Sequence, residues 1–186
     1  MDRAAQILRE NREFYQACAP AYDAGRQFSY LREQARVRAD LEWIGSSSPL
    51  AGAVVMDIGC GTGYYAMMAV SLGVAEVHLL DLNQVFLESA REKVLKTRPD
   101  LHVHCHLADL DSFIQERADL LRGIDIYLMG AVVQYVPDHE AVLERLAEGA
   151  GRGCFYITST LVPGGGRHRR ASRGRGSTST WASTAT

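Results

Sequence analysis

The sequence predicts an α/β fold with a doubly wound, mainly parallel sheet. Three observations indicate this class: helical segments alternate with short apolar runs, one apolar run ends in an acid and three alternating glycines, and two later runs also end beside acids. Such alternation is typical of a parallel sheet with helices on both faces. The expected strands lie near 53–58, 76–81, 101–107, 124–130 and 153–159.

The predicted helices precede and connect these strands. Helical periodicity covers 2–17 and 29–44, and the segment GSSSP at 45–49 breaks the second helix before the first strand. The later helices are expected at 64–72, 84–97, 111–122 and 138–148. We therefore divide the chain into an N-terminal helical cap (1–48), an α/β domain (49–160) and a basic tail without regular structure (161–186).

The first expected strand runs into a glycine loop, because residues 54–63 read VVMDIGCGTG. Glycine adopts positive φ and lets the backbone approach a ligand closely, so Gly59, Gly61 and Gly63 favour a nucleoside site. A dinucleotide loop would need a further glycine where Tyr64 stands, and the carboxylate of Asp57 would repel a pyrophosphate. The lysine-containing phosphate loop is also absent from the sequence. A cationic nucleoside without phosphate, S-adenosylmethionine (SAM), fits this loop.

Two more acids follow later strands. Asp81 ends the second strand about twenty residues beyond the glycines, which is the spacing at which an acid binds ribose hydroxyls. Asp109 follows the third strand and so lies at the same carboxyl edge of the sheet. Ligands of open α/β sheets bind at that edge.

These residues resemble the class I SAM-dependent methyltransferases, over roughly residues 10–160. The segment DIGCGTG at 57–63 is similar to the family's first motif, Asp81 to its ribose-binding acid and Asp109 to the acid that meets the adenine amino group. The resemblance implies that Leu82 and Leu110 flank the adenine ring. It assigns the cofactor site to Asp57, Gly59, Cys60, Gly61, Gly63, Asp81, Leu82, Asp109 and Leu110.

Some of these side chains have plainer alternatives. Asp57 could cap the turn, and Asp111 could be the cap of the helix that follows Asp109. Cys60 could be only a small residue in a crowded loop.

The acceptor side follows the fourth strand, where the segment YLMGAVVQYVPD at 127–138 is similar to small-molecule members of the family. We expect Tyr135 and His139 to be catalytic and Gln134 to contact the substrate. Tyr22 resembles an N-terminal tyrosine that closes over the cofactor. Packing is the alternative role for Tyr22 and Tyr135. A base is needed only if the acceptor loses a proton, because the sulfonium already makes the methyl group electrophilic.

Three alternating histidines, His102, His104 and His106, share one face of the third strand. Neighbours on one face of a strand are about 7 Å apart, which suits two ligands of one metal poorly. We therefore predict no metal site and expect a partly exposed edge strand. The four cysteines show no C-x-x-C spacing, so free, buried thiols are expected.

Composition favours one globular domain, because 47% of the 186 residues are hydrophobic and 23% are charged. The sequence shows no apolar run long enough to span a bilayer and no signal peptide, so we expect a cytoplasmic protein without a membrane partner. The tail carries five arginines and no acid. It could be a nucleic-acid arm, but its composition favours a shifted reading frame that truncates the fold after the fifth strand, so that the last strands of the resembled family are lacking. The unpaired edge of the fifth strand would then promote self-association.

The function that we predict is SAM-dependent methylation of a small molecule. Nucleic acid is not the expected acceptor, because residues 130–133 read GAVV where amino-methylating nucleic-acid enzymes carry an Asn/Asp-Pro-Pro-Tyr signature. The alternative is a catalytically silent remnant that binds the cofactor, or a subunit that another chain completes. An aminopropyltransferase that uses a decarboxylated relative of SAM shares the fold, but no acidic polyamine site follows the fourth strand.

Overall fold

Five parallel strands form the central sheet of the computed structural model, in the order β3-β2-β1-β4-β5. The structure describes residues 2–46, 49–158, 167–170 and 181–184. The predicted α/β class and its parallel sheet are confirmed, and each strand of this sheet lies inside the range expected for it. The strands are β1 (Val54–Ile58), β2 (Glu76–Asp81), β3 (His102–Leu107), β4 (Ile126–Gly130) and β5 (Cys154–Thr158).

The strand order reverses next to β1. From β1 the chain builds outward through β2 to β3, and it then returns to place β4 on the other side of β1 and β5 beyond it. Open α/β sheets bind ligands at the carboxyl ends of the strands on either side of such a reversal. Asp57 lies at this centre, since it is aligned with Leu79 of β2 and Leu128 of β4.

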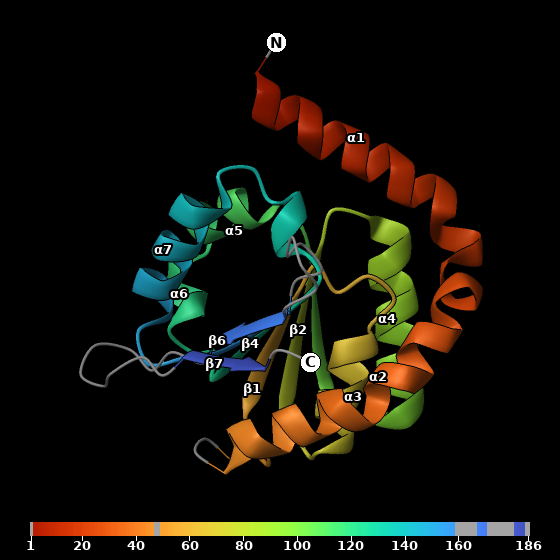
Figure 1. The fold of residues 1–186 in the computed structure, drawn as a ribbon, viewed down its shortest axis with the longest axis vertical. Helices are drawn as coiled ribbons and strands as arrows, with labels where there is room; N and C mark the ends of the chain where they lie inside the picture. Colours follow the sequence, from red (N-terminus) through yellow and green to blue (C-terminus); the bar gives the residue numbers. More distant parts are fainter. Residues whose placement is uncertain (1, 47–48, 159–166, 171–180, 185–186) are drawn as a thin grey trace.

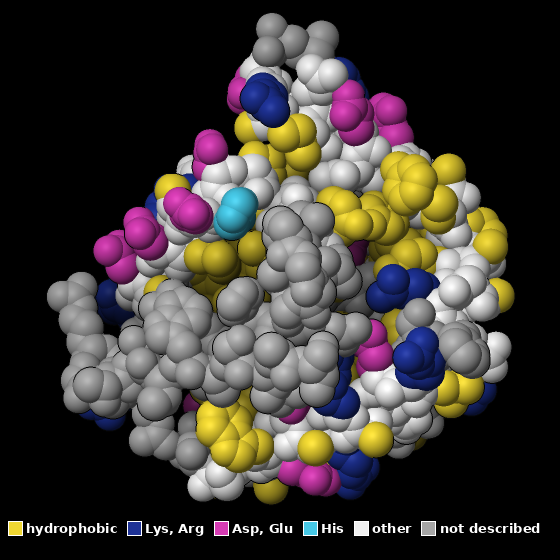
Figure 2. All heavy atoms as spheres, viewed as in Figure 1, with side chains coloured by type: hydrophobic (Ala, Val, Ile, Leu, Met, Phe, Trp, Pro, Cys, Tyr) yellow, Lys and Arg dark blue, Asp and Glu magenta, His cyan; other side chains and the backbone are white. Residues whose placement is uncertain are grey.

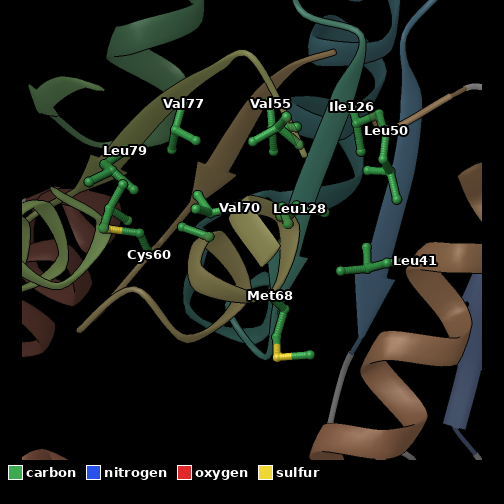
Figure 3. Packing of buried hydrophobic residues seen from close by; sticks show 14 of the residues in the cluster. Leu41, Leu50, Val55, Cys60, Met68, Val70, Val77, Leu79, Ile126 and Leu128 are labelled. Carbon is green, nitrogen blue, oxygen red and sulfur yellow. The ribbon is translucent and has the colours of Figure 1, made fainter. Parts of the chain in front are cut away.

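Helices cover both faces of the sheet (Figure 1). One hydrophobic cluster packs the sheet against α2 (Tyr22–Gly45), α3 (Tyr64–Ser71) and α4 (Gln84–Thr97). Figure 3 shows part of this cluster, with side chains of α2 and α3 close to those of the strands. A second cluster packs the opposite face against α5 (Leu110–Glu116), α6 (Ala118–Leu121) and α7 (His139–Ala150). The chain therefore forms three layers with two cores.

Two N-terminal helices precede the sheet. Asp2 caps α1 (Arg3–Cys18) by accepting a hydrogen bond from the Ala4 amide at 3.1 Å. A short 3₁₀ turn, η1 (Ala19–Ala21), leads directly into α2. The predicted start of this helix at residue 29 is therefore wrong. Pro20 fits the first turn of η1, where its missing N–H is not needed, and Gly25 is tolerated inside α2 with open space around it.

The helix predicted over 111–122 is divided into α5 and α6. Arg117 leaves the helical region, with φ −129° and ψ 36°, and lies between them. A tertiary hydrogen bond holds the end of α6 in place, because the buried Tyr127 hydroxyl donates to the Leu121 carbonyl at 2.5 Å. The hydrophobic period alone shows no such break.

Two short strands lie in the expected tail. Strands β6 (Arg167–Arg170) and β7 (Trp181–Thr184) pair antiparallel. The expectation of a tail without regular structure therefore does not hold for these two segments. Tryptophan and threonine favour strands, and pairing satisfies the backbone groups of both segments without an apolar period. The rest of 161–186 lies outside the described residues. Among the described helices, none has the length and hydropathy needed to cross a bilayer.

Candidate functional site

A cavity of about 970 Å³ opens at the carboxyl ends of the central strands. The loops after β1, β2, β3 and β4 contribute to its wall, and so do α1 and the start of α2. Its position agrees with the ligand site that the strand order predicts. Ten of the residues singled out from the sequence line it: Tyr22, Gly59, Gly61, Asp81, Leu82, Asp109, Leu110, Gln134, Tyr135 and His139.

The glycine loop after β1 brings bare backbone to the cavity. Gly59 has φ 63°, and a Cβ atom there would lie 2.2 Å from Cγ2 of Val132. Gly61 has φ 51°, and the side chain nearest to its missing Cβ is Tyr22, at 3.9 Å. Glycine is required at both positions, because L side chains rarely adopt these angles and Gly59 leaves no room for one. Gly61 therefore leaves open space under Tyr22.

Asp81 connects the end of β2 to this loop. Its Oδ2 accepts a hydrogen bond from the Gly61 amide, and its Oδ1 accepts one from the Asn83 amide, both at 2.9 Å. Burial raises the pKa of the Asp81 carboxyl, although these backbone hydrogen bonds oppose the shift. Since a carboxylate oxygen accepts more than one hydrogen bond, both oxygens have capacity left for hydroxyl donors of a ligand.

Asp57 lies beneath the loop and outside the cavity wall. Its side chain is fully buried, and Oδ2 accepts a hydrogen bond from the Ala66 amide in α3 at 2.9 Å. No described residue is a hydrogen-bond partner of Oδ1. Burial raises the pKa of the Asp57 carboxyl to about 7; the Ala66 amide opposes this shift and the charge of Asp81 adds to it. Asp57 therefore holds the first turn of α3 through Oδ2, while its Oδ1 has no hydrogen-bond partner among the described residues.

Cys60 and Gly63 also lie outside the cavity wall. Cys60 is buried in the cluster that includes Leu79, as Figure 3 shows. A Cβ at Gly63 would lie 2.9 Å from that of Ala90, so this glycine lets α3 and α4 pack closely. The structure thus shows packing contacts at both positions.

Asp109 lines the cavity and is also the N-cap of α5. Its Oδ1 accepts a hydrogen bond from the Ser112 amide at 2.9 Å, and its Oδ2 accepts one from the Ser112 hydroxyl at 2.7 Å. The alternative that Asp111 caps this helix is wrong, because Asp111 pairs with Arg145 at 2.6 Å. Leu110 lies next to Asp109 and is buried.

Aromatic side chains close the cavity on the N-terminal side. Tyr15 of α1 contacts Tyr22 and Tyr135, with ring centroids 6.2 and 5.6 Å apart. Phe86 of α4 joins them, 4.9 Å from Tyr22. Figure 2 shows hydrophobic side chains gathered where α1 lies near α4. Tyr22 and Tyr135 therefore pack against other aromatic rings, which is the alternative role considered for them, and they also line the cavity.

The segment after β4 supplies the rest of the acceptor side. Gln134 donates a hydrogen bond from Nε2 to the Ala131 carbonyl at 2.7 Å, and His139 begins α7 with an exposed side chain. Two residues other than glycine, Ala131 and Asp138, have positive φ, at 55° and 47°. Such strain often occurs at functional sites, and here it flanks the segment that lines the cavity.

Asn83 is a site residue that the sequence analysis missed. Its side chain is 4% exposed, lines the cavity and caps α4 by accepting a hydrogen bond from the Val85 amide. No described residue is a partner for its Nδ2. The signal was present, because asparagine immediately before a predicted helix favours the N-cap position. Tyr15 and Phe86 also line the cavity and were not expected there. Nothing in the sequence of their helices distinguishes them from residues that only pack.

A polar contact ties the start of α2 to the glycine loop. Asp23 accepts hydrogen bonds from the Thr62 hydroxyl and the Lys93 ammonium, and Lys93 also donates to the Thr62 carbonyl at 3.2 Å. Burial would raise the pKa of the Asp23 carboxyl, but these two donors lower it overall. The contact keeps α2 against the loop beside the cavity.

These features match the demands of a cationic nucleoside. Acids stand at the ends of β2 and β3, glycine backbone is exposed after β1, and Asn83 offers an unused donor beside Asp81. Three arginines line the wall: Arg145 pairs with Asp111, Arg26 lies over the rings of Tyr22 and Tyr30, and Arg12 belongs to α1. The residues therefore fit SAM.

Comparison with known families shows which family the chain belongs to. The family described as "Methyltransferase domain" matches residues 56–156. This chain belongs to the class I SAM-dependent methyltransferases. The cofactor of this methyltransferase family is SAM, as the glycine loop and Asp81 predicted.

Curated relatives cover different reactions. The methyltransferase chain is 34% identical over 111 residues to a ribosomal protein L11 methyltransferase of Symbiobacterium thermophilum, covering 60% of the chain and 33% of that protein. It is 28% identical over 144 residues to a ubiquinone biosynthesis O-methyltransferase of Thiobacillus denitrificans, covering 75% of the chain and 57% of the relative. The chain therefore spans between one third and three fifths of these relatives.

Among solved structures, the magnesium protoporphyrin IX methyltransferase of Synechocystis with bound SAM has the same fold. The TM-score is 0.65 at 19% identity, and the match covers 85% of this methyltransferase and 78% of that chain. At this identity the likeness supports the fold alone.

Proposed function

We propose that this chain transfers the methyl group of SAM to a small-molecule acceptor that binds in the same cavity. One observation carries the proposal: a single cavity of about 970 Å³ joins the glycine loop and Asp81 to an aromatic wall formed by α1, α2 and the segment after β4. This volume is at the upper end of the range for ligand pockets, which suits two small molecules side by side.

The cofactor end of the cavity is assigned to residues around the first three strands. Asp81 would accept hydrogen bonds from the ribose hydroxyls, with Asn83 as a nearby donor, and the backbone of Gly59 and Gly61 would lie along the cofactor. Leu82 and Leu110 would flank the adenine ring, while Asp109 would meet its amino group. The bound cofactor supplies an electrophilic methyl group on a sulfonium.

The acceptor end is assigned to the aromatic wall and the segment after β4. Tyr22 and Tyr135 would orient the acceptor and exclude water, and Gln134 would contact its polar groups. His139 is the candidate base, since an imidazole nitrogen can take the proton that a hydroxyl or amine acceptor loses on methylation. Orientation of the acceptor supplies much of the rate.

The aromatic wall favours a small acceptor over a macromolecule. Tyr15 connects α1 to the loop after β4 and to α2, so side chains from two elements lie over the cavity. A protein or nucleic acid would need an open groove at this place. The printed names of the relatives include both a protein methyltransferase and an enzyme of ubiquinone biosynthesis, so the acceptor class has to be tested directly.

Cofactor binding is tested by calorimetric titration with S-adenosylhomocysteine, the product form of SAM. We expect micromolar affinity and a loss of at least about tenfold in Asp81→Ala, because hydrogen bonds to a charged group are removed. Asp100→Ala is the matched control, since it removes an exposed carboxylate outside the cavity. No binding by the folded wild-type chain would contradict the cofactor site.

The acceptor class is tested with SAM labelled in its methyl group and a size-fractionated cell extract. Label in the small-molecule fraction that is lost in His139→Ala would support the proposal. Label in protein or RNA would contradict it. Cofactor binding without any transfer would favour the silent cofactor-binding alternative.

A further inference from the structure

Four side chains gather on one face of neighbouring strands, away from the cavity. Glu76 and His78 belong to β2, and His104 and His106 belong to β3. Alternate residues of a strand share a face, and the parallel register places His78 opposite His104. None of the four lines the cavity. They form a separate cluster near the outer edge of the sheet.

The cluster has the spacing of a metal site. His78 Nε2 lies 2.9 Å from Glu76 Oε1, and His104 Nε2 lies 3.1 Å from the same oxygen. One ligand atom from each of these three residues lies within 4.8 Å of the others. Tetrahedral zinc with bonds near 2.0–2.2 Å separates its ligand atoms by about 3.3 Å. Small side-chain adjustments would therefore place all three atoms around one ion.

His106 supports the orientation of His78. Its Nε2 lies 3.0 Å from His78 Nδ1, and the two rings are nearly parallel, at 5°. A histidine that binds metal through one nitrogen usually donates a hydrogen bond through the other. With His78 Nε2 on the ion, its Nδ1–H would donate to His106 Nε2. The second ring nitrogen thus already has a suitable acceptor.

The environment allows an ion to enter. The side chains of Glu76 and His104 are 32% and 48% exposed, whereas that of His78 is 6% exposed. β3 is the outermost strand of the described five-stranded sheet on this side, so the site faces solvent at an edge. Arg117 carries a positive charge near His78 and His106, and the Glu76 carboxylate offsets it.

The histidines along β3 alone are too far apart to share an ion. The structure supplies the missing ligands from β2, where Glu76 and His78 lie across the ladder from the β3 histidines. Cross-strand neighbours on one face are about 5 Å apart, closer than neighbours along one strand. Without the strand register, His78 has no visible connection to His104.

We propose that Glu76, His78 and His104 bind a divalent ion of the zinc type, with water at the remaining position. Two imidazoles and one carboxylate are ligands that Zn²⁺ accepts, and three protein ligands leave one position open. The ion takes the place of the N–H···O contact between His78 Nε2 and Glu76, and the neutral imidazole keeps its one proton on Nδ1, where it is donated to His106 Nε2, so the ring loses no proton. The bonds of the ion connect the edge strand β3 to β2.

The test is calorimetric titration of the untagged protein with zinc chloride, with Co²⁺ absorption as a second readout of ligand geometry. We expect one ion per chain with micromolar affinity. His104→Ala and Glu76→Gln should each weaken binding at least about tenfold. Cys105→Ser is the matched control, because it changes an exposed metal-ligating residue beside His104 on the opposite face of β3 and should leave the affinity unchanged.

Thermal unfolding shows whether each variant is folded and whether zinc stabilises it. Zinc should raise the melting temperature of the wild type and of Cys105→Ser, because an ion that binds only the folded state stabilises it. His104→Ala should remain folded, since its side chain lies at the surface, and should show no such rise. Equal zinc affinity in the wild type and both ligand variants, or no stoichiometric binding by the wild type, would overturn the proposal.

Discussion

The Oδ2 atom of Asp57 accepts a hydrogen bond from the Ala66 amide, so a fully buried acid joins the centre of the sheet to the first turn of α3. The other oxygen, Oδ1, has no partner among the described residues. An ionised carboxylate in this position is costly, because one hydrogen bond does not replace its hydration. The acid at the start of the family's first motif is therefore a source of instability in the protein without cofactor.

Asp57→Asn should change the pH dependence of stability. The unfolded carboxyl loses its proton near pH 4, whereas burial keeps folded Asp57 protonated up to about pH 7. Between these values the folded state binds more protons, so the free energy of unfolding falls as pH rises. The variant lacks this slope. At pH 8 it should exceed the wild type in stability by roughly 4 kcal/mol, measured by urea unfolding without cofactor.

The comparison at low pH is the control for Asp57→Asn. Near pH 4 the two proteins should be similarly stable, because an amide and a protonated carboxyl have nearly the same shape and both can accept from Ala66. Asp111→Asn changes an acid that is paired with Arg145 near the surface, and it should keep the wild-type slope between pH 4 and 7. Parallel curves for Asp57→Asn and the wild type would contradict the assigned burial.

Gly59→Ala should destabilise the protein by roughly 3 kcal/mol. The residue has φ 63°, which strains an alanine, and the new Cβ would lie 2.2 Å from Cγ2 of Val132. Thermal or urea unfolding measures the loss. The added methyl group also reaches toward the segment after β4, so cofactor affinity should fall with stability.

Two variants separate strain from collision at Gly59. Gly52→Ala has a similar positive φ of 83° with no atom within 4 Å of its Cβ, so it should cost only about 1 kcal/mol. Val132→Ala in the Gly59→Ala background should restore part of the stability by removing the close methyl group. Equal losses in Gly52→Ala and Gly59→Ala would mean that the loop has moved away from Val132.

Local patterns predicted the sheet well. The apolar run of β1, the glycine loop and Asp81 at the end of β2 are features of neighbouring residues in sequence, and the structure has them as expected. The helix boundaries were less predictable. Whether α2 continues across Gly25, and where α5 ends at Arg117, depends on packing and on hydrogen bonds such as the one from Tyr127 to Leu121.

The sequence predicted cavity residues that belong to a recognisable motif. It did not predict residues that reach the cavity through contacts between distant elements. Asp57 and Cys60 belong to the glycine motif, yet the alternation of the strand and the depth of the loop direct their side chains into the protein. Tyr15 joins the cavity only because α1 lies over the loop after β4. The sequence of α1 does not show which loop the helix lies over.

Asn83→Ser should weaken S-adenosylhomocysteine binding about tenfold with little change in stability. Serine keeps the N-cap acceptor for the Val85 amide, but it removes the Nδ2 donor that has no partner among the described residues and lies beside Asp81 in the cavity. Calorimetric titration measures the affinity, and the melting temperature checks the cap. Asn83→Ala should lose both binding and stability. Unchanged affinity in Asn83→Ser would show that Nδ2 makes no contact with the cofactor, whereas a large loss of stability would assign the residue to the fold of α4 alone.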